Sequence, residues 1–340
     1  MKGVQIVLDH IAGRQAAALL RDGILDDFLI DTDAPRPGTI YRAVALRPMK
    51  GQGGVFLSTP DGDAFLRQTR GIAPGQEMLV QVTGYAEPGK ALPVTDRLLF
   101  KSRYAIVTPG APGLNISRRI RDDARRDALL VTAREEMGES EHGLILRSSC
   151  MDGDTAEIAE DIRAMADLAA QVLDDQGKGA EVLAEGDGPH GLAWRDWTDP
   201  AQVHTAAGGF ADLGVLDALE ALKSPRAPLP GGGSVFVEPT RALVAVDVNT
   251  GADTSLAAGL KANLGCARAL PRQLRLRGLG GQIVIDLAPM PKNERRNFEA
   301  ALRRALKEDG IDTVLAGFTP LGHYELQRKR ARLPVLELLP

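Results

Sequence analysis

Residues 235–287 read VFVEPTRALVAVDVNTGADTSLAAGLKANLGCARALPRQLRLRGLGGQIVIDL, and this stretch decides the fold. Two short apolar runs, 242–248 and 283–287, are rich in Val and Ile and lie close to Gly, as is typical of buried strands. Between them apolar residues recur at helical spacing, at Leu256, Leu260, Leu264, Ala267, Leu270 and Leu274. The stretch therefore predicts a strand, a helix and a second strand.

An aspartate stands at the end of each predicted strand, Asp247 in the first and Asp286 in the second. A helical crossover makes its two strands parallel, so their C-terminal ends lie along one edge of the sheet. Asn249 lies two residues after Asp247 and therefore shares its face of the strand. Two carboxylates and an amide are oxygen ligands suited to a hard cation such as Mg²⁺. A single Asp in such a place is also common as a cap or turn residue.

Three segments together resemble the catalytic core of the ribonuclease E/G family: DVNTG at 247–251, RQLRLRGLGG at 272–281 and IVIDL at 283–287. The resemblance implies an endoribonuclease that cleaves single-stranded RNA in RNA processing or decay, leaving 5′-phosphate and 3′-hydroxyl ends. It implies Asp247 and Asp286 as ligands of a Mg²⁺ ion, for which Mn²⁺ can substitute, and Asn249 as their support. The alternative is an RNA-binding protein of the same fold that has lost catalysis.

The resemblance also implies an α/β multidomain fold. The expected parts are an RNase H-like segment at 1–34 and about 190–230, an inserted S1-like OB barrel at 38–103, a 5′-sensor-like region at 104–189, and a DNase I-like α/β catalytic domain at 231–340. Residues 1–34 read as a hairpin or two strands. The Pro- and Gly-rich segment SPRAPLPGGG is typical of a linker, which places the last boundary near Gly231.

Five short strand-like runs separated by Gly and Pro fill residues 38–103, as expected for a small OB-type barrel. Such barrels bind single strands by stacking bases on exposed aromatic rings beside basic residues. The family resemblance implies RNA contacts for Phe56, Phe65 and Lys90. Both phenylalanines also fit the barrel core, where most strand Phe residues lie.

Two further segments resemble family motifs: LNISRRI at 114–120 and GLILRSS at 143–149. The resemblance implies RNA contacts for Arg118 and Arg119, and a pocket for a 5′-monophosphate at Arg147 and Ser148. An arginine fork and a hydroxyl suit a terminal phosphate, because both donate hydrogen bonds to its oxygens. The alternative is a strand-end arginine in solvent.

The segment TPLGHYELQRKRAR at 319–332 resembles a basic family motif and makes Arg328, Lys329 and Arg330 candidates for phosphate contacts. His323 is read as an ordinary hydrogen-bonded histidine, because the family uses no proton carrier there. Trp194 and Trp197 lie three residues apart in a polar segment. They either stack on bases or pin the segment to the core, and the sequence does not choose.

The composition is that of a globular cytoplasmic protein: 340 residues, 44% hydrophobic, 25% charged, with no run long enough to span a membrane. The length favours two or three domains. The net charge of −4 does not by itself indicate a nucleic-acid binder, so local Arg clusters at 118–126, 268–277 and 328–332 have to decide. Each cluster is alternatively a solvated helix face.

The cysteines, Cys150 and Cys266, have no metal-ligand spacing, so neither a disulfide nor a structural zinc is expected. Long family members carry a CPxC pair through which two subunits share zinc. No such pair occurs up to Pro340, so a zinc-linked dimer is not supported, whereas a homodimer built by other contacts stays open.

Overall fold

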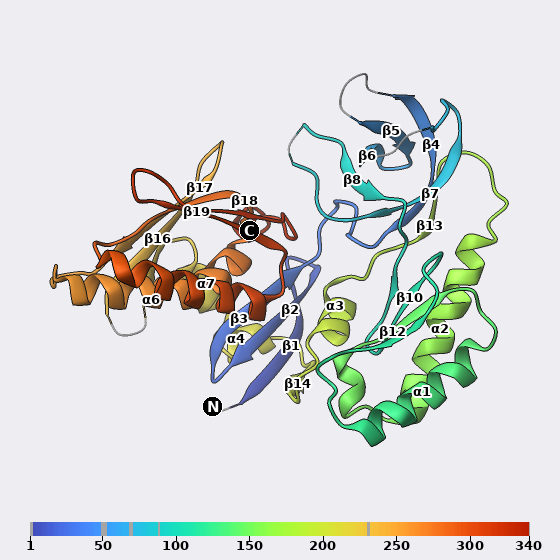
Figure 1. The fold of residues 1–340 in the computed structure, drawn as a ribbon, viewed down its shortest axis with the longest axis horizontal. Coiled ribbons are helices and arrows are strands. Elements are labelled where there is room, and N and C mark those ends of the chain that lie inside the picture. Colours follow the sequence, from blue (N-terminus) through green and yellow to red (C-terminus); the bar gives the residue numbers. More distant parts are fainter. Residues whose placement is uncertain (1–2, 49–52, 68–70, 88, 230–231, 340) are drawn as a thin grey trace. The chain divides into compact units, whose positions relative to one another are not determined.

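The computed structural model describes residues 3–48, 53–67, 71–87, 89–229 and 232–339 (Figure 1). The chain divides into two compact units, one made of residues 1–32 and 201–340 and the other of residues 33–200. Each unit is described on its own below. The predicted boundary near Gly231 lies outside the described residues, and the finer division into four domains stays a prediction.

The first unit begins with a sheet of three antiparallel strands, β1 (Val4–Ile11), β2 (Arg14–Arg21) and β3 (Ile24–Ile30), joined by β14 (Gln202–His204) parallel to β1. The sequence predicted a hairpin or two strands here, and the structure adds a third. Two short helices, α4 (Gly209–Asp212) and α5 (Val215–Ala221), supply Phe210 and Val215 to the core of this sheet.

The second sheet of this unit has six strands in the order β15-β16-β17-β18-β20-β19. They are β15 (Arg226–Pro228), β16 (Ser234–Pro239), β17 (Val244–Asn249), β18 (Gly281–Asp286), β20 (Tyr324–Arg328) and β19 (Thr313–Phe318). The predicted strand, helix, strand order is confirmed, and β17 and β18 pair in parallel. The other pairings described in this sheet are antiparallel.

Two long helices cover one face of this sheet, α6 (Leu256–Arg277) and α7 (Arg295–Asp309), as Figure 1 shows. Ser255 caps the start of α6 by accepting a hydrogen bond from the Ala258 amide, and Gly278 ends it in the left-handed conformation. Apolar residues of α6 and α7 share one core with Val246 and Ile285 of the sheet. Short 3₁₀ turns complete the segment at Lys292–Glu294 and Val335–Glu337.

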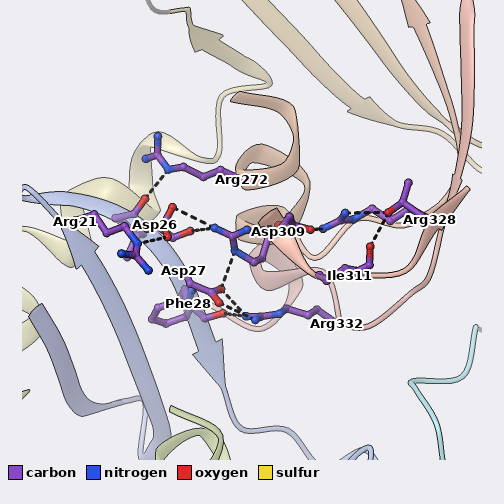
Figure 2. A network of polar contacts seen from close by, with 12 residues as sticks. Arg21, Asp26, Asp27, Phe28, Arg272, Asp309, Ile311, Arg328 and Arg332 are labelled. Atoms are coloured by element: carbon purple, nitrogen blue, oxygen red, sulfur yellow. Dashed lines mark hydrogen bonds and ion pairs between the residues drawn. The ribbon is translucent and has the colours of Figure 1, made fainter. Parts of the chain in front are cut away.

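A network of ion pairs joins these two sheets within the first unit (Figure 2). Arg275 of α6 pairs with Asp26 and Asp27 of β3 and with Asp309 at the end of α7. Asp309 also accepts a hydrogen bond from Arg328, and both side chains are only 1% exposed. Burial opposes the charge of Arg275, yet its three carboxylate neighbours raise its pKa above the ordinary value. The network therefore holds buried charges by pairing them.

The second unit contains a closed barrel, β4 (Ile40–Pro48), β5 (Gly54–Thr59), β6 (Gly62–Arg67), β8 (Leu92–Thr95) and β7 (Glu77–Val82), which closes by pairing β7 with β4. This five-strand barrel confirms the predicted OB-like architecture. Alternate residues such as Tyr41, Leu57 and Val80 fill its interior. A sixth strand, β13 (Glu181–Ala184), pairs with residues 40–42 at the start of β4 and was not predicted.

The rest of this unit is a four-stranded sheet in the order β11-β12-β10-β9: β11 (Leu114–Ile116), β12 (Gly143–Leu146), β10 (Ala105–Thr108) and β9 (Phe100–Lys101). Helices α1 (Asp123–Met137) and α2 (Thr155–Leu173) pack their apolar sides on it. A 3₁₀ turn (Ser148–Met151) and α3 (Pro189–Asp196) follow. No described helix of the chain is both long and apolar enough for a membrane span.

Candidate active site

Two aspartates stand side by side at the ends of β17 and β18. Val244, Val246 and Val248 of β17 are buried, so the alternation of the strand turns Asp247 to the opposite, solvent-facing side. The parallel register pairs Asp247 directly with Asp286. Adjacent strands lie about 4.8 Å apart, and residues paired in register point to the same face. The structure therefore brings the two carboxylates together on the exposed face of the sheet.

Each carboxylate lies beside a polar side chain. The Asn249 side-chain amide Nδ2 donates a hydrogen bond of 2.7 Å to Asp247 Oδ2. The Nδ1 atom of His323 lies 3.3 Å from Asp286 Oδ1. His323 directly precedes Tyr324, which pairs with Ile285, so the antiparallel register of β18 and β20 delivers the imidazole to Asp286. Sequence reasoning read His323 as an ordinary histidine on the family resemblance, and it did not foresee that β20 lies beside β18.

The chain just after Asp286 is fastened to helix α6 by Asn263. This side chain is fully buried, donates 2.8 Å to the Ala288 carbonyl oxygen and accepts 3.0 Å from the Ala288 amide. Gly259 lies one turn earlier, where an added Cβ would stand 1.9 Å from the Pro289 carbonyl oxygen. The helix thus approaches residues 288–289 closely enough to fix the end of β18. Sequence reasoning missed both residues, since neither carries a reactive group.

The pair of carboxylates matches the protein ligands that Mg²⁺ prefers. Mg²⁺ is usually held by one or two carboxylates together with waters and substrate phosphates. Among the described residues, neither Asp247 nor Asp286 forms an ion pair with Lys or Arg. Nor do the described residues contain a group of three or more His, Cys, Asp or Glu side chains arranged for a metal.

The two barrel phenylalanines lie outside the barrel core. Phe56 and Phe65 are directly paired across β5 and β6, with ring centroids 5.0 Å apart, while their neighbours Val55, Leu57 and Leu66 point inward. Both rings are partly exposed. The structure therefore decides between the two readings of the sequence in favour of a surface pair. An added Cβ at Gly54 would lie 2.4 Å from the Phe65 ring, so glycine makes room for this ring.

A hollow of about 450 Å³ lies beside Phe56, and its lining includes Asp61, Asp63, Lys90 and Leu92. Lys90 is exposed and forms an ion pair of 2.9 Å with Glu87. Arg67 is also exposed and lies two residues after Phe65, hence on the same side of β6. Arg67 was not among the predicted contacts, although its spacing from Phe65 would have indicated it once the outward direction of the ring was known.

The Arg147 guanidinium is hydrogen-bonded to acceptors of its own chain. Its Nη2 donates 2.8 Å to Asp196, and its Nη1 donates to the carbonyl oxygens of Ser102 and Arg195. Ser148 follows it at the start of a 3₁₀ turn. Arg118 and Arg119, by contrast, have exposed side chains. The structure thus keeps Arg147 and Ser148 adjacent but commits the guanidinium to protein acceptors.

The basic segment at the C-terminal end divides into buried and exposed members. Arg328 is 1% exposed and bound to Asp309, so the prediction that it contacts a phosphate is wrong for this structure. Lys329 and Arg330 are exposed. The strand alternation explains the division, because Arg328 points to the same side of β20 as the buried Leu326.

A sequence profile described as the Ribonuclease E/G family matches residues 100–205 and 197–331 of the chain. The chain therefore belongs to this family. Ribonuclease G of Escherichia coli strain K12 is 26% identical over 403 aligned positions, covering 98% of this chain and 81% of the relative. Ribonuclease G of Haemophilus influenzae is 24% identical, covering 98% of this chain and 80% of the relative.

Ribonuclease E of Nostoc sp. strain PCC 7120 is 28% identical over 383 aligned positions. This match covers 95% of the present chain but only 56% of that longer relative. The similarity to both kinds of relative thus extends over nearly all of this chain.

Proposed function

We propose that this protein is a Mg²⁺-dependent endoribonuclease that cleaves single-stranded RNA and takes part in RNA processing or decay. The observation that carries the proposal is the register of β17 and β18, which pairs Asp247 with Asp286 on an exposed sheet face. Membership of the ribonuclease E/G family and the OB-like barrel support it.

In this proposal Asp247 and Asp286 hold the divalent ion, for which Mn²⁺ can substitute. When bound, the ion supplies a water of lowered pKa and neutralises charge on a phosphate oxygen. Asn249 fixes the orientation of Asp247 through its 2.7 Å hydrogen bond. Hydrolysis in this site leaves 5′-phosphate and 3′-hydroxyl ends, in keeping with the family resemblance.

The barrel supplies the grip on the RNA strand. The paired rings of Phe56 and Phe65 offer faces to unpaired bases, and Lys90 and Arg67 offer charge to the phosphates. Stacking on aromatic rings tolerates any base sequence, so this surface favours single strands without strict sequence preference. The exposed Arg118, Arg119, Lys329 and Arg330 are further phosphate-contact candidates.

Arg147 and Ser148 remain our candidates for a 5′-monophosphate pocket, with one consequence of the structure. A terminal phosphate has to displace Asp196 from Arg147, because that carboxylate already accepts from its Nη2. If the pocket forms, we expect RNA with a 5′-monophosphate to be cleaved faster than RNA with a 5′-hydroxyl, and equal rates would overturn the pocket. A strong preference for the monophosphate would show that Asp196 gives way.

The direct test uses purified protein and a 5′-labelled single-stranded RNA, with Mg²⁺ or with a chelator. We expect cleavage only with the metal, and loss of cleavage in Asp286→Asn with RNA affinity retained. Glu238→Gln is the matched control, because Glu238 is an exposed carboxylate on the neighbouring strand β16 and pairs with Ala245 rather than with an aspartate. Salt-dependent binding without any cleavage would replace the proposal by the alternative, a binding protein without catalysis.

A further inference from the structure

One aromatic side chain of the second unit is largely exposed to solvent. Trp194 on α3 is 63% exposed, and among the described residues no other Trp, Tyr or Phe falls in the exposed class. The helix is anchored instead by its buried neighbours Pro189 and Ala193. A large exposed aromatic ring that the fold does not need is typical of a contact surface.

The Trp194 ring is held in place from one side. The Arg103 guanidinium carbon lies 4.2 Å from the ring centroid, and its Nη1 donates to the Trp194 carbonyl oxygen. The same guanidinium lies 5.7 Å from the Tyr104 ring, and the Tyr104 hydroxyl donates to Glu157. Because the Arg103 guanidinium stacks against one face of the indole, the exposed face is the opposite one. The orientation of the ring is therefore set before a ligand arrives.

The surroundings of Trp194 carry surplus positive charge. Asp196 accepts from Lys101 at 2.9 Å, from Arg147 at 2.8 Å and from Arg195 at 2.9 Å. Arg195 also pairs with Asp187. We call these residues, with Arg103, the Trp194 cluster: Lys101, Arg103, Arg147, Asp187, Arg195 and Asp196. Counted with Glu157, which accepts from Tyr104 beside Arg103, three carboxylates face its four cations and leave one positive charge in excess, within a chain whose net charge is −4.

The cations dominate the cluster electrostatically. Partial burial opposes ionisation of Asp196, but hydrogen bonds and attraction from Arg195 and Lys101 hold its pKa well below the usual range. Asp196 therefore stays ionised in neutral solution and offsets one of the three cations that it holds in place. Surplus positive charge beside a flat ring is the combination that binds single-stranded nucleic acid.

We propose that the open face of Trp194 is a stacking platform for an unpaired nucleobase, with the surplus charge of the Trp194 cluster drawing in the adjoining phosphates. The inference rests on the proposed function, which supplies single-stranded RNA as the ligand class, and it adds a contact outside the barrel and the aspartate pair. One stacked base contributes an affinity factor of about 5 to 150.

The chain contains two tryptophans, Trp194 and Trp197, so intrinsic fluorescence reports the stacking directly. The probe is an oligoadenylate of about 12 nucleotides, within the usual site size of such surfaces, added in chelator so that no cleavage occurs. Three proteins are compared: wild type, Trp197→Phe and Trp194→Phe. Inorganic polyphosphate of matched charge controls for attraction by phosphate alone.

We expect saturable quenching by oligoadenylate in wild type and in Trp197→Phe, little in Trp194→Phe, and little from polyphosphate. Trp194→Ala should weaken oligoadenylate binding by the factor of about 5 to 150 given above. Quenching that persists in Trp194→Phe, unchanged affinity in Trp194→Ala, or equal quenching by polyphosphate would each overturn the platform. If Trp197→Phe does not fold, the comparison of quenching in wild type with quenching in Trp194→Phe tests the platform by itself.

Cleavage of labelled RNA with Mg²⁺ by the same preparations separates the two proposals. Normal cleavage by Trp194→Ala at every RNA concentration, with no Trp194-dependent quenching, overturns the platform and leaves the nuclease. Trp194-dependent quenching by the wild type without cleavage supports the platform and overturns the nuclease. A protein that neither binds nor cleaves RNA overturns both.

Discussion

Two groups of aspartates in the first unit have opposite environments. Asp309 is 1% exposed and is bound by Arg275 and Arg328, with Asp26 and Asp27 sharing Arg275 (Figure 2). Asp286 has a 67% exposed side chain, and its ion-pair neighbour among the described residues is His323. Aspartate therefore stabilises the fold as an ion-pair partner in the first group, whereas in the second it stays exposed at a sheet edge, where it can bind a ligand.

The difference indicates how the chain separates stability from chemistry. Buried carboxylates are neutralised by arginines, because an unpaired buried charge is very costly. Among the described residues, the polar neighbours of the sheet-edge carboxylates are Asn249 and His323 rather than Lys or Arg, so their charge is free to attract a cation. The basic side chains follow the same division, since Arg328 is buried whereas Lys329, next to it, is exposed. The following predictions test this division, beginning with the largest effect.

Replacing Asp309 should damage stability more than any other change considered. Asp309→Ala leaves Arg328 buried without its carboxylate and removes one of the partners of Arg275. Breaking a buried pair in this way costs about 3–5 kcal/mol. The measurement is urea unfolding followed by circular dichroism. Glu308→Ala is the matched control, because Glu308 is a 68% exposed neighbour paired only on the helix surface with Arg304. Equal stability of the two variants would contradict the division.

Asn263 connects the two regions, since it lies in the core yet holds the end of β18. Asn263→Ala removes both hydrogen bonds to Ala288. The buried amide and carbonyl of Ala288 are then unpaired, which lowers the free energy of unfolding by about 1–3 kcal/mol for each group. We also expect a higher Mg²⁺ concentration for half-maximal cleavage, because Asp286 loses its support. A purely structural role would lower stability and leave that concentration unchanged.

Asn249 should show the opposite pattern. Its side chain is exposed, so Asn249→Ala should leave unfolding within about 0.5 kcal/mol of wild type. Cleavage should fall about 10- to 100-fold, as is usual when a group that orients a metal ligand is lost. Gln282→Ala, at an exposed position of β18, serves as control. Unchanged turnover in Asn249→Ala would show that Asp247 needs no orientation.

The smallest expected effect concerns the two cysteines. Burial raises the pKa of Cys150 to about 11 and that of Cys266 to about 12. The reactive thiolate is therefore scarce at about pH 8. A colorimetric thiol reagent should detect almost no free thiol in the native protein and both thiols after unfolding in denaturant. Rapid reaction of the native protein would contradict the burial of these side chains.

The part of the site that was predictable from sequence is local. Alternating and continuous apolar runs identified β17, β18 and the five barrel strands, and the crossover placed Asp247 beside Asp286. The remainder depends on pairings distant in sequence. His323 reaches Asp286 only because β20 lies between β18 and β19, and no local pattern specifies that order.

The arginines show the same limit. Charge runs at 268–277 and 328–332 are compatible with a phosphate surface or a solvated helix, and burial decides between these readings. Arg328 proved to be buried in contact with α7, whereas Arg275 and Arg147 are half-buried and bonded to β3 and α3. Partners up to 305 positions away in the chain, as for Arg332 and Asp27, leave no periodic signal.

The most direct test of the account is Mn²⁺ binding followed by electron paramagnetic resonance, with Mn²⁺ in place of Mg²⁺ and a short single-stranded RNA present. If Asp247 and Asp286 together hold the ion, the wild type should bind Mn²⁺, Asp247→Asn and Asp286→Asn should each lose most of that binding, and Glu238→Gln should keep it. If both aspartate variants bind Mn²⁺ as strongly as the wild type does, the claim that this pair forms the metal site is contradicted.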